Sequence, residues 1–196
     1  MAPNRYSFLV ILSNVVLSQL TRLSGDPAPF RIYILEKESE SALCAYTDRE
    51  QWAAVPKEKD PEFTVTAEFV DGVLTRLLVQ KFTEDSTTYD EYGVNKEGSV
   101  RQLKRTRDIT PERVTIEQVW RVQRGQAVKI SEIWTQFATH KRLAPDKELR
   151  DSLAGPVFVR VAEFPFYPIL RDLNVSRWPN GMHCIPGSLR SMELMR

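Results

Sequence analysis

The fold is decided by residues 62–137, which read EFTVTAEFVDGVLTRLLVQKFTEDSTTYDEYGVNKEGSVRQLKRTRDITPERVTIEQVWRVQRGQAVKISEIWTQF. Apolar and polar residues alternate from Phe63 to Phe69, as they do in a strand with one buried face. Asp71-Gly72 follows, and this dipeptide is typical of a two-residue hairpin turn, in which both positions need a positive φ. Turn residues recur at 84–86, 95–98 and 123–125. The stretch therefore predicts about six consecutive antiparallel strands.

Two segments before this stretch extend the predicted sheet. Residues 30–35 and 42–46 have strand composition, which brings the expected number to about six to eight strands. Consecutive hairpins must curl or close, because an open twisted sheet leaves hydrogen-bonding edges exposed. We therefore expect a mainly β fold, an antiparallel meander that forms a barrel, a half-barrel or a curved sheet. One or two short helices accompany it, at residues 48–55 with Asp48 as N-cap and at residues 146–153.

The chain divides into three predicted parts. In residues 1–25 the apolar run FLVIL follows Arg5, which is typical of a signal peptide; a membrane anchor and an ordinary buried element of the fold are the alternatives. Residues 26–178 form a single β-rich domain, and residues 179–196 have so little periodicity that we expect a poorly ordered tail. The protein is then secreted or periplasmic, and it meets a membrane only through an uncleaved N-terminal segment.

Composition and charge exclude few classes of protein but weigh against some. The 42% hydrophobic and 27% charged fractions are those of an ordinary globular protein. The net charge of +1 gives no field that would steer nucleic acid, so we expect no nucleic-acid partner. Cys44 and Cys184 either form a disulfide between the C-terminal and N-terminal segments in an oxidising compartment or remain thiols in a reducing one, and the sequence leaves both open.

Reactive motifs are missing from the sequence. His140 and His183 are its two histidines, and neither lies in a metal-binding spacing such as HxH or HExxH. A nucleophile elbow and a phosphate-binding glycine loop are also absent from the sequence. The sequence therefore predicts no catalytic residue, no metal site and no cofactor.

Aromatic residues are the main candidates for a binding site. On a curved sheet, aromatic side chains of the concave face either fill the core or line a cavity for an apolar ligand. The proline-punctuated segment 164–170 is expected to lie across the sheet as a plug or lid. The candidate ligand-binding residues are Phe69, Phe82, Tyr92, Trp120, Trp134, Phe164, Phe166 and Tyr167. The favoured function is thus a non-enzymatic binding or structural role, with an apolar small molecule or a protein as partner.

Charged residues suggest the alternatives. Acidic residues at 84, 85, 90 and 91 lie on one predicted hairpin, and basic residues at 101, 104, 105 and 107 follow on the next strand. Their pairing predicts ordinary cross-strand ion pairs. A hydrolytic enzyme that uses Glu84, Asp90 or Glu91 is one alternative, and a local patch for an anionic ligand is another. A third is a protein-interaction module, which would show a long unpaired edge strand or a large apolar patch.

Overall fold

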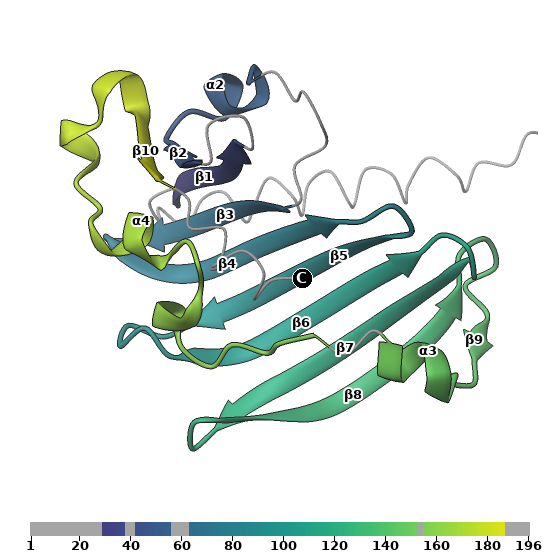
Figure 1. Cartoon of the computed structure of the whole chain (residues 1–196). Helices are drawn as coiled ribbons and strands as arrows, with labels where there is room; N and C mark the ends of the chain where they lie inside the picture. The colour runs from purple at the N-terminus through teal and green to yellow at the C-terminus, as the bar shows by residue number, and fades with distance from the viewer. Residues whose placement is uncertain (1–28, 38–41, 56–62, 153–154, 187–196) are drawn as a thin grey trace, which may run out of the picture.

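The computed structural model describes residues 29–37, 42–55, 63–152 and 155–186. Ten antiparallel strands form one sheet that is not closed, in the order β10-β2-β1-β3-β4-β5-β6-β7-β8-β9 (Figure 1). The strands are β1 (Phe30–Lys37), β2 (Ala42–Tyr46), β3 (Phe63–Val70), β4 (Val73–Phe82), β5 (Ser86–Val94), β6 (Val100–Ile109), β7 (Val114–Gln123), β8 (Gln126–Gln136), β9 (Arg142–Leu143) and β10 (Met182–Pro186).

The predicted fold class is confirmed, as a curved open sheet rather than a barrel. Strands β3 to β8 follow one another as the turn residues predicted, each paired with the next. The hairpin at Asp71-Gly72 has φ of 51° and 75°, and Arg124-Gly125 makes an equivalent two-residue turn with φ of 51° and 76°. Positive φ at both positions is what a type I′ turn requires, and its twist matches that of the flanking strands.

The helices are short. They are α2 (Arg49–Ala53), α3 (Lys147–Ser152) and α4 (Tyr167–Arg171). The predicted cap of α2 is present, since Asp48 Oδ1 accepts a hydrogen bond from the backbone N–H of Glu50 at 2.7 Å. Asp146 likewise accepts one from the backbone N–H of Leu149, 2.9 Å away, at the start of α3. Among the described residues, none of the helices is long and apolar enough to cross a membrane.

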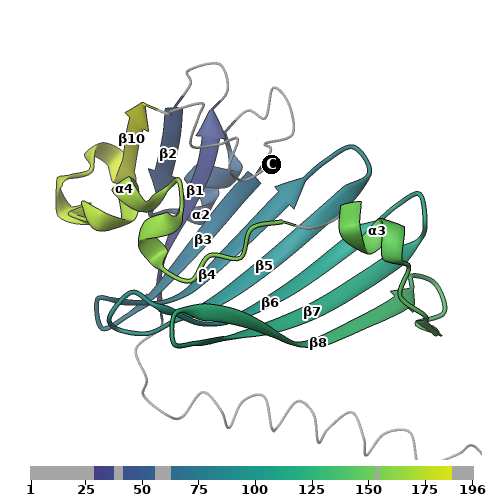
Figure 2. The same cartoon turned by 60° about the horizontal axis from the view of Figure 1, so that its bottom comes forward.

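One face of the sheet is covered by residues 155–178, which we call the strap; we call this face the covered face (Figure 2). Strap residues Phe164, Phe166 and Ile169 are at most 2% exposed and belong to the main core. They pack against sheet residues such as Leu77 and Tyr92, so the core lies between the strap and strands β1 to β6. The strap meets the backbone of the sheet at one bridge, between Ser99 and Arg160. The expected position of segment 164–170 across the sheet agrees with this arrangement.

The C-terminal part differs from its prediction. Residues 182–186 form β10, which pairs along its whole length with β2, and Cys184 lies opposite Cys44, to which it is joined by a disulfide. The expectation of a poorly ordered tail therefore fails for residues 179–186, because the disulfide and the backbone ladder hold a segment whose own sequence shows no strand periodicity. Residues 187–196, and residues 1–25 with the predicted signal peptide or anchor, lie outside the described residues.

Candidate polar band on the covered face

A band of polar side chains crosses the covered face between two apolar clusters. The main core lies on one side of it, and a smaller cluster that contains Ile116 and Trp134 lies on the other. The cross-strand register aligns the band, because partners in adjacent strands point to the same face. We call this set the polar band: Lys81, Thr88, Asp90, Arg105, Arg107, Gln118 and Glu132.

An ion pair between Asp90 and Arg105 forms the centre of the band. Arg105 donates from Nε to Oδ1 of Asp90 at 2.6 Å and from Nη2 to Oδ2 at 2.7 Å. The two side chains are 3% and 1% exposed for Arg105 and Asp90, respectively, so the pair is almost completely shielded from water. Arg105 Nη2 also donates to the backbone carbonyl of Pro156 at 3.0 Å, which ties the strap to the band. Its guanidinium carbon lies 5.4 Å from the ring centre of Trp120.

The surroundings shift the pKa values of this centre. Burial alone lowers the pKa of Arg105, but the hydrogen bonds and charge of Asp90 outweigh it and leave the pKa raised. Burial raises the pKa of Tyr92, and the negative charge of Asp90 raises it further. The Tyr92 hydroxyl donates to Oδ2 of Asp90 at 3.2 Å. The Asp90 carboxylate thus accepts three hydrogen bonds and is fully engaged.

Positive charge exceeds negative charge around Lys81. Lys81 lies opposite Thr88, and Thr88 lies opposite Arg107, whose Nε donates to the Thr88 hydroxyl at 3.0 Å. Burial lowers the pKa of Lys81 and of Arg107, and the positive charge of Arg105 lowers both further. Lys81 has no ion-pair partner within 4.0 Å among the described residues. Asp90 thus pairs directly with Arg105, and the negative charge of Asp90 also acts on the nearby Lys81.

The strap closes over these cations at a glycine. A Cβ atom added to Gly155 would lie 3.4 Å from Nη1 of Arg105 and 3.8 Å from Nη2 of Arg107. Both distances are those of ordinary van der Waals contact, so the strap passes directly beside the two guanidinium groups at Gly155.

Glu132 forms the other end of the band. Its carboxylate accepts hydrogen bonds from Gln118 at 2.9 Å, from Trp134 Nε1 at 3.1 Å and from Arg150 of α3, as well as from Lys129. Burial by itself would raise the pKa of Glu132, but these four donors hold it at about 2. The carboxylate thus joins β7, β8 and α3 while it remains ionised.

The low pKa of Glu132 predicts a pH-dependent contribution to stability. A carboxyl whose folded pKa lies below its unfolded value stabilises the fold above the unfolded value, near 4.3, and loses this effect as the pH falls toward 2. We expect Glu132→Gln to lower the free energy of unfolding by about 1–3 kcal/mol at pH 7. Urea denaturation from pH 7 to pH 2 should show the two proteins converging in acid; a constant difference would contradict the assignment.

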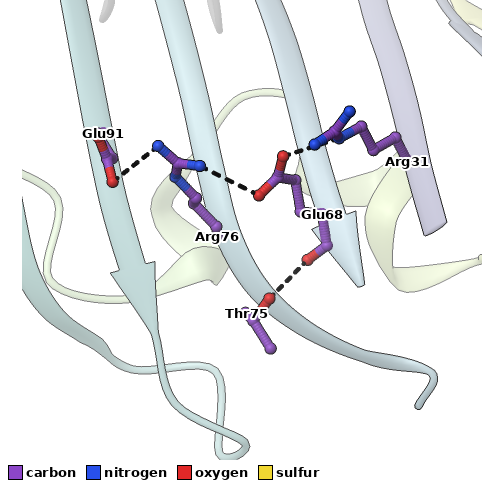
Figure 3. A network of polar contacts seen from close by, with 5 residues as sticks. All are labelled: Arg31, Glu68, Thr75, Arg76 and Glu91. Atoms are coloured by element: carbon purple, nitrogen blue, oxygen red, sulfur yellow. Dashed lines mark hydrogen bonds and ion pairs between the residues drawn. The ribbon is translucent and has the colours of Figure 1, made fainter. Parts of the chain in front are cut away.

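The carboxylates considered for hydrolysis do not meet. Asp90 lies in the band, whereas its neighbour Glu91 points to the opposite, outer face and pairs with Arg76 at 3.0 Å. Figure 3 shows that Arg76 also reaches Glu68, which binds Arg31 Nε at 2.8 Å, so these charges form a ladder across β1, β3, β4 and β5. Glu84 lies exposed in the turn after β4. Because Asp90 and Glu91 point to opposite faces of the sheet, they do not form a pair that could act on one substrate, and the hydrolytic alternative stays a prediction.

The register brings the acidic and basic segments together, and one predicted ion pair forms between them, Asp90 with Arg105, whereas Glu91 pairs with Arg76 and Lys104 with Glu117. Asp90 lies opposite Arg105 and Glu91 lies opposite Lys104. Sequence reasoning placed these charges together but missed that alternation sends Arg105 and Arg107 to the covered face and Lys104 to the outer one. It also missed Lys81. This lysine follows Val79 by two residues in β4, and this spacing places both side chains on the same face of the sheet.

The aromatic candidates separate into three groups. Tyr92, Phe164 and Phe166 pack together in the main core, with ring centres 4.8 Å apart for Tyr92 and Phe164 and 5.0 Å for Phe164 and Phe166. Four further candidates belong to the two apolar clusters of the covered face or pack against them: Phe69, Trp120, Trp134 and Tyr167. Phe82 follows Lys81 in β4 and therefore points to the outer face, away from the others. Their role in binding stays a prediction.

The histidines lie at opposite ends of the sheet. His183 lies in β10 and stacks on Trp178, with ring centres 5.3 Å apart, whereas His140 lies beyond the end of β8. A hollow of about 260 Å³ opens on the outer face beside Tyr89 and Lys104. The charged groups along its wall are already paired, Glu91 with Arg76 and Lys104 with Glu117, so it offers less for a charged ligand than the polar band does.

The band thus combines a buried carboxylate that accepts three hydrogen bonds with Lys81, which has no ion-pair partner among the described residues. Comparisons of the chain with protein-family models, with curated proteins and with solved structures found no match.

Proposed function

We propose that this protein is an exported, non-enzymatic binding protein that holds an amphipathic anion on the covered face of its sheet. The observation that carries the proposal is the position of Lys81, which lies in the polar band beside the Asp90–Arg105 pair and has no ion-pair partner among the described residues. Removing a cation from water costs free energy unless an opposite charge or hydrogen bonds compensate it. A carboxylate bound at Lys81 would supply that compensation.

The apolar surroundings of the band support an apolar tail on the ligand. Val79 and Phe63, at the end of the main core next to Lys81, are 2% exposed. The strap that covers this core contains Phe164 and Phe166 and is joined to the backbone of the sheet at the Ser99–Arg160 bridge. A segment held mainly by side-chain packing moves more easily than a paired strand. An acyl tail would take the place of part of the packing between strap and sheet.

The disulfide between Cys44 and Cys184 supports export. Disulfides persist in oxidising compartments and are rare in the cytosol. The bridge also joins β10, the strand that follows the strap, to β2, and so it anchors the C-terminal end of the strap.

Lys81→Met should weaken binding of dodecanoate about tenfold, because it removes a cation that no described residue pairs with and keeps the length of its side chain. Lys104→Met is the matched control, since it removes the same charge from the outer face of β6 and should leave affinity unchanged. Titration calorimetry with dodecanoate and with dodecanol, which has the same chain length but no charge, measures both effects.

The two ligands also test the proposal without a variant. We expect the carboxylate to bind at least about tenfold more tightly than the alcohol. Equal affinity for the two, or equal loss in Lys81→Met and Lys104→Met, would reject the anion site. Binding of neither compound, together with an unliganded mass for protein purified gently from its own source, would reject the ligand-carrying function as a whole.

A further inference from the structure

Strand β8 leaves a long edge of the sheet open. It has eleven residues, and β9 pairs with it only at Trp134 and Thr135. Residues 126–133 lie at the lower edge of the sheet in Figure 1. On the side of this segment that faces away from β7, no strand pairs with it among the described residues. The opposite edge, β10, is only five residues long and ends in Pro186, a common way to protect an edge. The β10 edge is therefore short and ends in a proline, whereas the β8 edge is long and largely unpaired among the described residues.

The open part of β8 is also apolar. Val128, Ile130 and Ile133 are 47%, 51% and 38% exposed, and they account for three of the seven large hydrophobic residues exposed among the described part of the chain. An exposed edge strand with apolar side chains is a template for pairing with another strand.

A β-bulge sets the faces of these side chains. The register between β7 and β8 shifts at Val119 and Trp120, so that Ser131 faces Val119 and Lys129 faces Trp120, and Ile130 is the extra residue. Without the bulge, Val128 and Ile133 would point to opposite faces, because they are an odd number of residues apart. With it, both lie on the outer face, while Lys129 and Glu132 lie on the covered face.

We propose that a second copy of this chain pairs antiparallel with β8, about a twofold axis between Ile130 and Ser131. In this register Val128 lies opposite Ile133 of the second copy, and Lys129 lies opposite Glu132 of the second copy. Apolar residues then meet twice on the outer face because of the symmetry. On the covered face Lys129 of each copy also approaches Glu132 of the other, beside the Lys129–Glu132 pair that each chain already contains.

Neighbouring registers lack this match. A shift by one residue in one direction sets Val128 against Glu132 of the second copy, which points to the other face of the sheet. A shift by two sets Val128 against Ser131 and Lys129 against Ile130, with neither an apolar pair nor a charge pair. The shift by one also sets Ile130 opposite Ile130 of the second copy, which is a single apolar pair, and shifts in the other direction set Val128 against Trp134 or Thr135, whose edge β9 already occupies. The proposed register alone combines two apolar pairs with opposite charges, which favours a second copy over an unrelated partner strand.

The paired segment is short, so the dimer should be weak. Six residues from each chain bury less area than the roughly 1,200–2,000 Å² of a standard stable interface. We expect a dissociation constant on the order of micromolar or higher. Sedimentation velocity of the full chain at concentrations that span this range should show a reversible monomer–dimer equilibrium.

Val128→Lys should weaken association at least about tenfold, because each copy would set a charge against Ile133 of the other. Val73→Lys is the matched control: Val73 is 39% exposed in the hairpin that begins β4, away from β8, and its substitution should leave the dimer unchanged. Thermal denaturation of both variants checks that each one is folded before association is measured.

A mixture of two variants tests the register itself. Val128→Lys and Ile133→Asp should each be monomeric alone, but a heterodimer of the two sets the introduced charges opposite each other on one side and leaves Val128 opposite Ile133 on the other. Recovery of dimer in the mixture alone supports the proposal. A monomeric wild type at all concentrations, wild-type association of Val128→Lys, or equal weakening by Val73→Lys would overturn it, and none of these results bears on ligand binding.

Discussion

Asp90→Ala should destabilise the protein by about 3–5 kcal/mol, because it removes one partner of a buried ion pair and leaves the other charged. Arg105 is 3% exposed in its side chain, and both of its bonds to Asp90 would be lost. The Tyr92 hydroxyl would lose its acceptor as well. Urea denaturation followed by the fluorescence of the tryptophans gives the free energy of unfolding.

Two controls separate charge from packing in this experiment. Asp90→Leu combined with Arg105→Leu removes both charges of the pair, and it should cost less than Asp90→Ala alone, because the buried Arg105 is no longer left without its carboxylate. Glu91→Ala breaks the exposed pair with Arg76 on the outer face, where we expect a loss below about 1 kcal/mol. If Asp90→Ala and Glu91→Ala cost the same, the buried ion pair does not have the role described here.

Loss of the disulfide should have the second large effect. Cys44 and Cys184 are 140 residues apart in sequence, so the bridge closes most of the chain into one loop. Constraining so long a loop in the unfolded chain stabilises the native state by up to about 5 kcal/mol in the chain-entropy model, and removal of native bridges costs about 2–5 kcal/mol. Cys44→Ala combined with Cys184→Ala should therefore lower the midpoint of thermal unfolding, and a reducing agent should do the same to the wild type.

Hydrogen exchange locates the effect of the missing bridge. Strand β10 pairs only with β2, so its amides should lose protection first, whereas those of β6, in the middle of the sheet, should lose it only with global unfolding. Matched protection of β10 with and without the bridge, or an unchanged free energy of unfolding, would show that the backbone ladder alone holds the C-terminal segment.

Local sequence was sufficient to predict the central strands. Asp71-Gly72 specifies its hairpin because few residues adopt a positive φ without strain, and the alternation from Phe63 to Phe69 has the period of a strand. The N-cap at Asp48 was readable for the same reason, since its oxygen bonds a backbone N–H two residues away. In each case the partners lie close together in the chain.

The polar band was beyond local reasoning. Residues 81, 90 and 105 come from three strands, and whether they meet depends on the register of two pairings and on which face the strap covers. The residues of the basic segment looked equivalent in the sequence, but alternation gives Lys104 to the outer face and Arg105 to the interior.

By itself, then, the sequence determined the elements that arise from contacts between near neighbours: the hairpin turns, the strand periods from β3 to β8 and the capped helices. Only the tertiary structure decided what depends on contacts between distant segments. It made β10 a strand through its pairing with β2 and the bond to Cys44, it chose the face that the strap covers, and it placed Lys81 beside other cations with no ion-pair partner among the described residues. The physical reason is that burial and charge balance belong to the whole folded chain, whereas turns and caps belong to a few adjacent residues.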